Sequence, residues 1–333
     1  MVEPLPDPRL TPLDGAQGEA ATAHEGEESE RRLAFVDASL HGQRLDKAVV
    51  AMAGEFSRNH LQSLIEQGHV SVDGAAACSA SRKVRAGQCI EVELVPTAES
   101  RAFRAEPLPL QVVYEDAHLL VLDKAAGMVV HPAAGNWSGT VLNGLLAHHA
   151  AAAALPRAGI VHRLDKDTSG LMLVGKTLPS VTALVRAIAA REVHRQYAAV
   201  VHGHVTPARF SVDAPIARDP KSRIRMAVVA SGKPARTDVE RVAHDNGFSA
   251  VRCTLHTGRT HQIRVHLASR GHPLVADALY GGQPALDMLR QALHAERLGL
   301  AHPVSGLPLS FHAAQPADFA AAWNVIAHSA SRP

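Results

Sequence analysis

The chain has 333 residues, of which 46% are hydrophobic, 20% are charged and only 4% are aromatic. This length predicts two domains, and the apolar content excludes a chain that is disordered throughout. We find no apolar run of the roughly 18–20 residues that a membrane span needs, no secretory leader and no paired cysteines. We therefore expect a reduced, cytoplasmic protein with no disulfide framework and no contact with a membrane.

The formal net charge of +2 conceals two parts of opposite charge. Residues 1–30 hold one basic and eight acidic residues, a net charge of −7, so the remaining 303 residues carry +9. A basic body of this kind usually has an anionic partner. The acidic start of the chain hides that preference from the total.

The first third of the chain is predicted to contain an arm, a small domain and a linker. Residues 1–34 are rich in Pro, Gly, Ala and Glu without an apolar period, which is typical of a disordered acidic arm. Residues 35–96 predict one helix over 44–53, a second from an N-cap at Ser57 to Gln67, then the strand VSV, a turn at Asp73-Gly74 and the strand CIEVEL. Residues 97–109 are polar and contain prolines, as linkers do.

Residues 110–325 predict a larger α+β domain around a mixed, mostly antiparallel sheet, and residues 326–333 a short tail. Helices are expected in GTVLNGLLAHH after Gly139 and in SVTALVRAIAAREVH, with Ser180 as a candidate cap. Strands are expected in the runs LLVL, MVV, GLMLVG, YAAVVHGHV, RTDVERVA, FSAVRCTLHTG and HQIRVHLAS.

Three short motifs indicate functions that their surroundings do not favour. Residues 170–177, GLMLVGKT, match the phosphate-binding pattern G-x-x-x-x-G-K-[ST], but LMLV favours a buried strand over an open loop. An NTPase that uses Lys176 therefore stays only as a distant alternative. The sequence HRLD at 162–165 differs from the kinase H-R-D loop by an extra leucine and has no other kinase motif beside it. The sequence HGH at 202–204 lacks a third ligand, so we expect no metal.

The segment GIVHRLDKDTSG, residues 159–170, concentrates charged and hydroxyl side chains directly before a buried strand. Polar residues at a strand end are poor material for a core and a common way to build a site. Turn capping could account for the Asp, Thr and Ser residues, but not for Arg163 and Lys166 in the same loop. We interpret this loop as a candidate active site.

A second candidate region spans residues 252–272, which hold four arginines, four histidines and no acid. These cations need carboxylates from elsewhere in the fold or phosphates from a ligand. A strand here would place Gln262, Arg264 and His266 on one face and Ile263 and Val265 on the other. Residues 216–236 are similarly one-sided, with six basic residues against one acid, which favours contact with a polyanion.

Aromatic side chains are too few for extensive stacking on single-stranded RNA, since the chain has only two Trp, three Tyr and seven Phe residues. Tyr197 lies in RQYAAVV, where basic and polar residues lead into a strand and the next residues are small. A lone tyrosine in such a place more often belongs to the core. Its small neighbours nevertheless leave room for the ring to meet a flat ligand.

Together these segments resemble the RluA/RluD type of RNA pseudouridine synthase. The resemblance covers residues 36–322 in order and rests on GIVHRLDKDTSGLMLVGKT, REVHRQYAAVVHG and LHTGRTHQIRVHLASRGHPLVADALYG. The unit that begins GQRLDKAVV is similar to the S4-like αL RNA-binding domain of that family. Within the family the chain is most similar to the RluD branch, which modifies a stem-loop of large-subunit 23S rRNA. Ala276 stands where the family usually has glycine.

The resemblance implies an isomerisation in which uracil is detached from C1′ of its ribose, turned and rejoined through C5, with no cofactor. It implies that Asp165 is the essential nucleophile or base and that Arg264 is the cationic partner that keeps it ionised. Tyr197 would lie against the target base, which must leave its stack to be reached. The implied contacts to the uridine and the RNA are Arg163, Ile263, His162 and Arg259.

The residues leave other functions open. An enzyme of the same class could act like RluC or on tRNA, since the catalytic motifs do not separate these targets. A non-catalytic S4-type RNA-binding protein is a further alternative, although it would not need Asp165, Tyr197 and Arg264 together. We expect the partner to be large-subunit rRNA or a pre-50S particle, and the protein to be a monomer.

Overall fold

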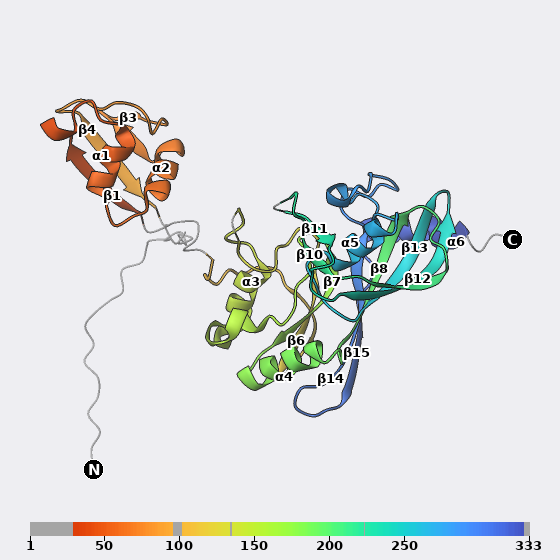
Figure 1. The fold of residues 1–333 in the computed structure, drawn as a ribbon. Helices are drawn as coiled ribbons and strands as arrows, with labels where there is room; N and C mark the ends of the chain where they lie inside the picture. Colours follow the sequence, from red (N-terminus) through yellow and green to blue (C-terminus); the bar gives the residue numbers. More distant parts are fainter. Residues whose placement is uncertain (1–28, 96–101, 134, 223, 330–333) are drawn as a thin grey trace, which may run out of the picture. The chain divides into compact units, whose positions relative to one another are not determined.

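The computed structural model describes residues 29–95, 102–133, 135–222 and 224–329 (Figure 1). The chain divides near residue 97 into two compact units, each with a hydrophobic core of its own. None of the helices in the described ranges is long and apolar enough to cross a membrane.

The smaller unit packs two helices against a four-stranded antiparallel sheet with the strand order β1-β4-β2-β3. The predicted N-cap is confirmed, because the Ser57 hydroxyl accepts a hydrogen bond from the backbone N–H of His60. The predicted turn is confirmed too, since Asp73 and Gly74 both have positive φ. The elements are β1 (Glu30–Phe35), α1 (Leu45–Met52), α2 (Arg58–Glu66), β2 (Val70–Val72), β3 (Ala75–Ala76) and β4 (Cys89–Leu94).

The expected disordered arm ends earlier than residue 34. Residues 30–35 form β1, which pairs with β4 from Glu30 opposite Leu94 to Phe35 opposite Cys89. The three charged residues at the start of this segment conceal its strand character, which comes from pairing with an available edge strand. Arg31 strengthens the pairing, with nitrogens 3.6 and 3.7 Å from carboxylate oxygens of the facing strand. Residues 1–28 of the expected arm lie outside the described residues.

A buried carboxylate joins the two helices of this unit. Asp46 in α1 is fully buried and accepts hydrogen bonds from Arg44 at 3.0 and 3.1 Å, from Arg58 at 2.9 Å and from Gln62 at 2.8 Å. Burial alone would raise the pKa of Asp46, but these hydrogen bonds hold the pKa well below its usual range. Because Arg58 and Gln62 belong to α2, the cluster fixes how α1 packs on α2.

The larger unit is built on a nine-stranded sheet with the order β5-β6-β7-β14-β8-β13-β12-β9, and β15 pairs with β14. The expected mixed, mostly antiparallel sheet is confirmed, since β7 and β14 run parallel and the other pairs described here run antiparallel. The strands are β5 (Gln111–Glu115), β6 (Leu119–Lys124), β7 (Ser169–Gly175), β8 (His194–His202), β9 (Arg209–Asp213), β12 (Arg236–Asp245), β13 (Phe248–Leu255), β14 (Leu293–Ala301) and β15 (Pro308–His312).

Alternate residues of the central strands enter different cores on the two faces of the sheet. Figure 1 shows the helices around the sheet, which are α3 (Val141–His148), α4 (Leu178–Ala189), α5 (Gln262–Ser269) and α6 (Ala317–Ser329). A small separate pair of strands consists of β10 (Ile216–Arg218) and β11 (Met226–Val228). In β8, Tyr197 and Ala199 belong to the core that includes α3, whereas Ala198 and Val200 pack with α6. Helix α4 packs with the residues of β7 that face away from α3. Coverage of both faces explains why β7 is buried along its whole length.

Strand β7 contains the sequence that matches a phosphate-binding loop. As predicted, it is a strand whose backbone pairs with β6 along its length and with β14 at its start. The Lys176 ammonium is 2.7 Å from the Glu115 carboxylate and donates a hydrogen bond of 2.6 Å to the Asp116 carbonyl. Because the amides are used in the sheet and the lysine is already neutralised, this geometry is incompatible with a nucleotide-binding loop.

The predicted strand HQIRVHLAS is wrong, because residues 262–269 form helix α5. Polar Gln262, Arg264 and His266 alternate with apolar residues, which imitates a half-buried strand, but in the structure residues 262–267 are all buried in a helix. In the helix, Ile263 and Leu267 are four residues apart and enter the main core together. Gln262 fixes the start of α5 by accepting hydrogen bonds from the Thr257 hydroxyl and the Arg259 backbone.

Four further details differ from the predictions. The run MVV is not a strand. Helix α4 is capped by Thr177 and not by Ser180, because the Thr177 hydroxyl accepts a hydrogen bond from the backbone N–H of Ser180, which lies inside the first turn. The second half of the expected linker is attached to the larger unit, since the Asn143 side chain donates to the carbonyl of Arg104 at 2.9 Å. The expected tail begins inside α6, where Ile326 is buried against the sheet.

The depressed pKa of Asp46 predicts a pH-dependent contribution to stability. A carboxylate whose folded-state pKa lies below its unfolded value stabilises the fold above the unfolded pKa, and this contribution is lost as the pH falls below about 4. We expect Asp46→Asn to lower the free energy of unfolding of this unit by about 1–3 kcal/mol at pH 7 and by less at pH 3. Denaturant unfolding at the two pH values measures this. The exposed Glu66→Gln is the control, and a deficit that does not shrink at low pH contradicts the account.

Candidate active site

A cavity of about 500 Å³ lies in the larger unit between the loop before β7, strand β8 and the segment that leads into α5. The three sequence regions singled out above therefore meet at one place. All seven predicted site residues line this cavity, namely His162, Arg163, Asp165, Tyr197, Arg259, Ile263 and Arg264.

The loop that carries Asp165 is held at its base by a buried lysine and a glycine. The Lys124 ammonium donates to the carbonyls of Ala125, Met128 and Lys166 at 2.8, 3.0 and 2.9 Å. Burial lowers the pKa of Lys124 to about 8. Gly170 ends the loop with φ +110°, and a Cβ there would lie 2.3 Å from the carbonyl oxygen of the strand alongside, so only glycine fits.

Arg264 lies between two carboxylates and makes a hydrogen bond with each of its three guanidinium nitrogens. Its Nε and Nη2 donate to the two oxygens of Asp277 at 2.8 Å each, and its Nη1 donates to Asp165 Oδ2 at 3.0 Å. Asp277 is almost fully buried, whereas the Asp165 side chain keeps 15% exposure toward the cavity. The geometry thus separates an inner carboxylate, which orients the arginine, from an outer one, which can meet a ligand.

The pKa of Arg264 reflects this double pairing. Burial alone would lower it, but the hydrogen bonds and negative charges of Asp277 and Asp165 raise the pKa of Arg264 above its usual range. The guanidinium group also lies over the Tyr280 ring at 5.0 Å from its centroid. Arg264 therefore stays charged and has little freedom to move.

A histidine faces the other oxygen of Asp165. His261 Nε2 is 3.8 Å from Asp165 Oδ1, and its Nδ1 is 2.8 Å from the Tyr280 hydroxyl. That hydroxyl accepts a hydrogen bond from the backbone N–H of Met226, so its own proton can go to Nδ1. Burial lowers the pKa of His261, which favours a neutral ring whose remaining proton lies on the nitrogen that faces Asp165.

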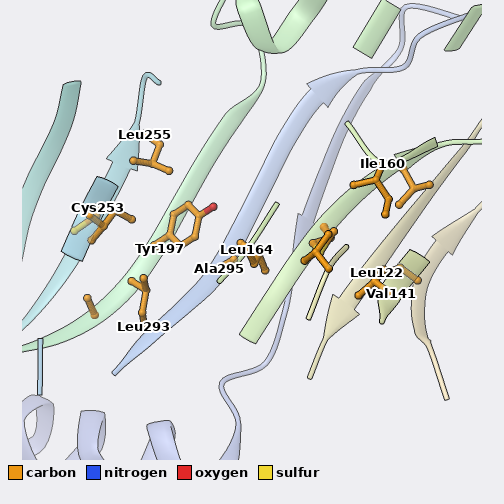
Figure 2. Close-up of a cluster of buried hydrophobic side chains, with 14 of the residues drawn as sticks. Leu122, Val141, Ile160, Leu164, Tyr197, Cys253, Leu255, Leu293 and Ala295 are labelled. Atoms are coloured by element: carbon orange, nitrogen blue, oxygen red, sulfur yellow. The ribbon is translucent and has the colours of Figure 1, made fainter. Parts of the chain in front are cut away.

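Tyr197 and Ile263 form the apolar wall of the cavity. Figure 2 shows Tyr197 on β8 between side chains of β13 and β14, close to Leu255 on one side and Ala295 on the other. Only 6% of Tyr197 is exposed, and burial raises the pKa of its hydroxyl. The ring is therefore both part of the core and part of the cavity wall, so the two interpretations of this tyrosine do not exclude each other.

The remaining predicted residues differ in whether their side chains already have hydrogen-bond partners within the protein. Arg163 and Arg259 are exposed at the cavity, although the Nε of Arg259 donates to the Pro234 carbonyl at 3.1 Å. His162 is already engaged, because its Nε2 accepts a hydrogen bond from the backbone N–H of Leu173 at 2.9 Å. Burial, together with the charge of a neighbouring arginine, lowers the pKa of His162 to about 3, so it stays neutral.

The unpaired cations of residues 252–272 find their partners in different ways. Arg252 is 3.2 Å from the Glu296 carboxylate, and Arg270 lies over the ring of Phe210. Arg264 donates hydrogen bonds to Asp277, which is the first acidic residue after this stretch in the sequence. Asp277 was missed as a site residue, and its position as the first acid after a long basic stretch is the signal that could have indicated it.

The arrangement suits chemistry at an electron-poor carbon of a flat ligand. A fixed carboxylate faces a cavity with one aromatic wall and several cations, which is how a nucleophile or general base is usually presented. Among the described residues, no three His, Cys, Asp or Glu side chains come together in a way that could hold a metal ion.

Known proteins match both units of the chain. The family model described as RNA pseudouridylate synthase matches residues 118–269, which include most of the cavity, and the S4 domain matches residues 43–90 in the smaller unit. Two human proteins, RNA pseudouridylate synthase domain containing 1 and 4, share the fold with a TM-score of 0.51 each, at 24% and 21% identity. They cover 67% and 64% of this chain, and 86% and 91% of their own chains are matched.

Bacterial relatives are much closer in sequence. The ribosomal large subunit pseudouridine synthase D of Nitrosomonas europaea is 46% identical, with 89% of each chain covered. The proteins of the same name from Pasteurella multocida and Escherichia coli are 46% and 44% identical, covering 86% of this chain and 92% and 91% of theirs. This chain therefore belongs to the RNA pseudouridylate synthase family, and it also contains an S4 domain.

Proposed function

We propose that this protein converts specific uridines of large-subunit 23S rRNA to pseudouridine without a cofactor, in the cytoplasm. The observation that carries the proposal is the Asp165 carboxylate, held by Arg264 and open to a cavity with Tyr197 in its wall. Relatives at 44–46% identity over most of the chain are named for the large ribosomal subunit, which favours this RNA over tRNA. Free rRNA and assembling 50S particles both present such uridines.

The reaction moves the bond between ribose and uracil from N1 to C5. The N1–C1′ bond breaks, the C5–C1′ bond forms, the proton on C5 leaves and N1 takes up a proton, so the atoms balance without a redox partner. Asp165 supplies the nucleophile or base for this exchange. Arg264 keeps the carboxylate pointed at the cavity during the steps in which the uracil turns.

The cavity wall accounts for how the base is held. Tyr197 offers a flat, neutral ring instead of a charge, and burial, which raises the pKa of its hydroxyl, reinforces this. Ile263 adds an apolar contact in the same wall. A uridine inside a helix cannot reach this wall, so it must leave its stack. We assign to Arg163, which is exposed at the cavity, the role of occupying the space that the uridine vacates.

The smaller unit offers a basic surface for the rest of the RNA. Arg82, Lys83 and Arg85 are exposed, and Lys83 is bridged through its backbone to Arg44 next to α1. Arg44 and Arg58 share the single buried carboxylate of Asp46, which leaves positive charge at this surface. Such clusters bind phosphates with little sequence preference and position the RNA for the catalytic unit.

Asp165→Asn tests the proposed reaction. We expect the purified wild-type protein to form pseudouridine in transcribed 23S rRNA and the variant to be slower by about 10³-fold or more, because an amide is neither nucleophile nor base. Mass spectrometry of the digested nucleosides measures the product. Asp167→Asn is the matched control in the same loop and should keep most of the activity. Absence of product with wild-type protein, or normal activity in Asp165→Asn, would falsify the proposal.

Asp277→Asn tests the support of the site. This change keeps the shape of the side chain but weakens its grip on Arg264, so we expect the single-turnover rate to fall by about 10- to 100-fold with little change in RNA affinity. Arg264→Lys should have a similar effect, since an ammonium cannot bond both carboxylates as a guanidinium does. The exposed Asp287→Asn serves as control. If the rate is unchanged in Asp277→Asn, the inner carboxylate does not orient the arginine.

Replacing Arg82, Lys83 and Arg85 with glutamine tests the role of the smaller unit. On a long rRNA fragment we expect weaker binding and a slope of log K against log salt that is smaller by about 2 units. On a minimal stem-loop that holds only the nucleotides next to the target uridine, the rate should stay close to wild type. Equal losses on the two substrates would mean that the unit is structural and does not bind RNA.

A further inference from the structure

Arg195 is a buried cation in the cavity wall for which the described residues provide no counter-ion. It is 4% exposed, and its Nε is a buried donor with no hydrogen-bond partner. It forms no ion pair with any carboxylate in the described ranges. By contrast, the other arginine of the cavity with comparable burial, Arg264, has carboxylate oxygens at all three nitrogens.

An unpaired guanidinium is strongly disfavoured in a protein interior, and buried charges are normally paired. Arg252, which is opposite Ala198 on the adjacent strand β13 and so on the other face of the sheet, follows this rule with Glu296 at 3.2 Å. The fold thus supplies acids to arginines that serve its own structure. The missing partner of Arg195 is expected to come with the ligand.

The position of Arg195 relates it to the target base. Arg195 is two residues before Tyr197 on β8, so both side chains leave the strand on the same face, and both line the same cavity. Nη1 of Arg195 approaches Gly258 closely, since a Cβ built there would lie 2.9 Å from it. The guanidinium group therefore lies beside the loop that leads into α5.

The charge around this space favours an anion. Besides Arg195 and Arg264, the cavity is lined by exposed arginines at its edge, and Asp165 is the single acid among the described lining residues. Since Asp165 is already bonded to Arg264, it does not compensate the remaining cations. The lining arginines at the edge are Arg157, Arg163, Arg191 and Arg259.

We propose that Arg195 binds a non-bridging oxygen of a phosphodiester that adjoins the flipped uridine; this rests on the proposed function. A phosphate carries the permanent negative charge that a buried guanidinium lacks, and its oxygens match the guanidinium fork. The neutral carbonyl groups of uracil would leave the charge uncompensated. With the base against Tyr197 and the phosphate at Arg195, the ribose is held at both ends and its C1′ is directed to Asp165.

The test combines Arg195→Met with RNA stem-loops in which one phosphate at a time, on either side of the target uridine, is replaced by an uncharged methylphosphonate. We expect one such replacement to weaken binding to wild-type protein by about 10-fold or more and to have no further effect on Arg195→Met. Arg252→Met is the matched control, which loses a cation on the next strand and should respond to the methylphosphonate as wild type does. Independent, additive losses at every linkage would overturn the proposal.

Two further readouts separate this inference from a structural role and from the proposed function. Arg195→Met should keep or raise the melting temperature, because it removes an uncompensated charge; a marked fall would mean that the arginine is structural. Inorganic phosphate should raise the melting temperature of wild type and Arg252→Met more than that of Arg195→Met. Equal rises in all three would contradict an anion site. This titration needs no RNA, so it stays informative even if wild-type protein makes no pseudouridine.

Discussion

The site depends on the position of one guanidinium group. Arg264 on α5 bonds Asp277 through two nitrogens and Asp165 through the third, so three separate segments of the chain share one buried ion cluster. A cation between two carboxylates is stable in a protein interior only when its donors are satisfied, and here all three nitrogens have an acceptor. The carboxylate that we propose to react is therefore aimed at the cavity before a ligand arrives, and ligand binding need not create the geometry.

The sheet makes this cluster possible by bringing its three parts to one edge of the core. The parallel pairing of β7 with β14 requires Gly170, and it fixes the end of the loop that carries Asp165. Lys124 holds the same loop by a backbone carbonyl. The cations of the cavity then divide into two kinds. Arg264 is paired with two carboxylates of the fold, whereas Arg195 has no carboxylate partner among the described residues. This difference distinguishes a structural arginine from one that we propose to bind an anion.

The sequence predicted which segments form the candidate site more accurately than it predicted the secondary structure of those segments. The segments of Asp165 and Arg264 were singled out because they concentrate charge where a core would be apolar, the resemblance implied these two residues within them, and the two side chains do meet. The segment of Arg264 was nevertheless predicted as a strand, because polar and apolar residues alternate in it, whereas in the structure the polar ones are buried as well and the segment is a helix. Asp277 was missed because its role depends on its contact with Arg264, which is thirteen residues earlier in the chain. The strand at 30–35 could not be foreseen locally either, since pairing with β4 creates it.

The central claim is that this cavity makes pseudouridine in large-subunit rRNA. The most direct measurement is chemical mapping of pseudouridine along 23S rRNA from cells that have the gene, cells that lack it and cells in which it is restored. The account predicts that a small set of uridines in a stem-loop loses the modification without the gene and regains it on restoration. Identical maps from all three would contradict the account, and changes confined to tRNA would contradict the assigned substrate.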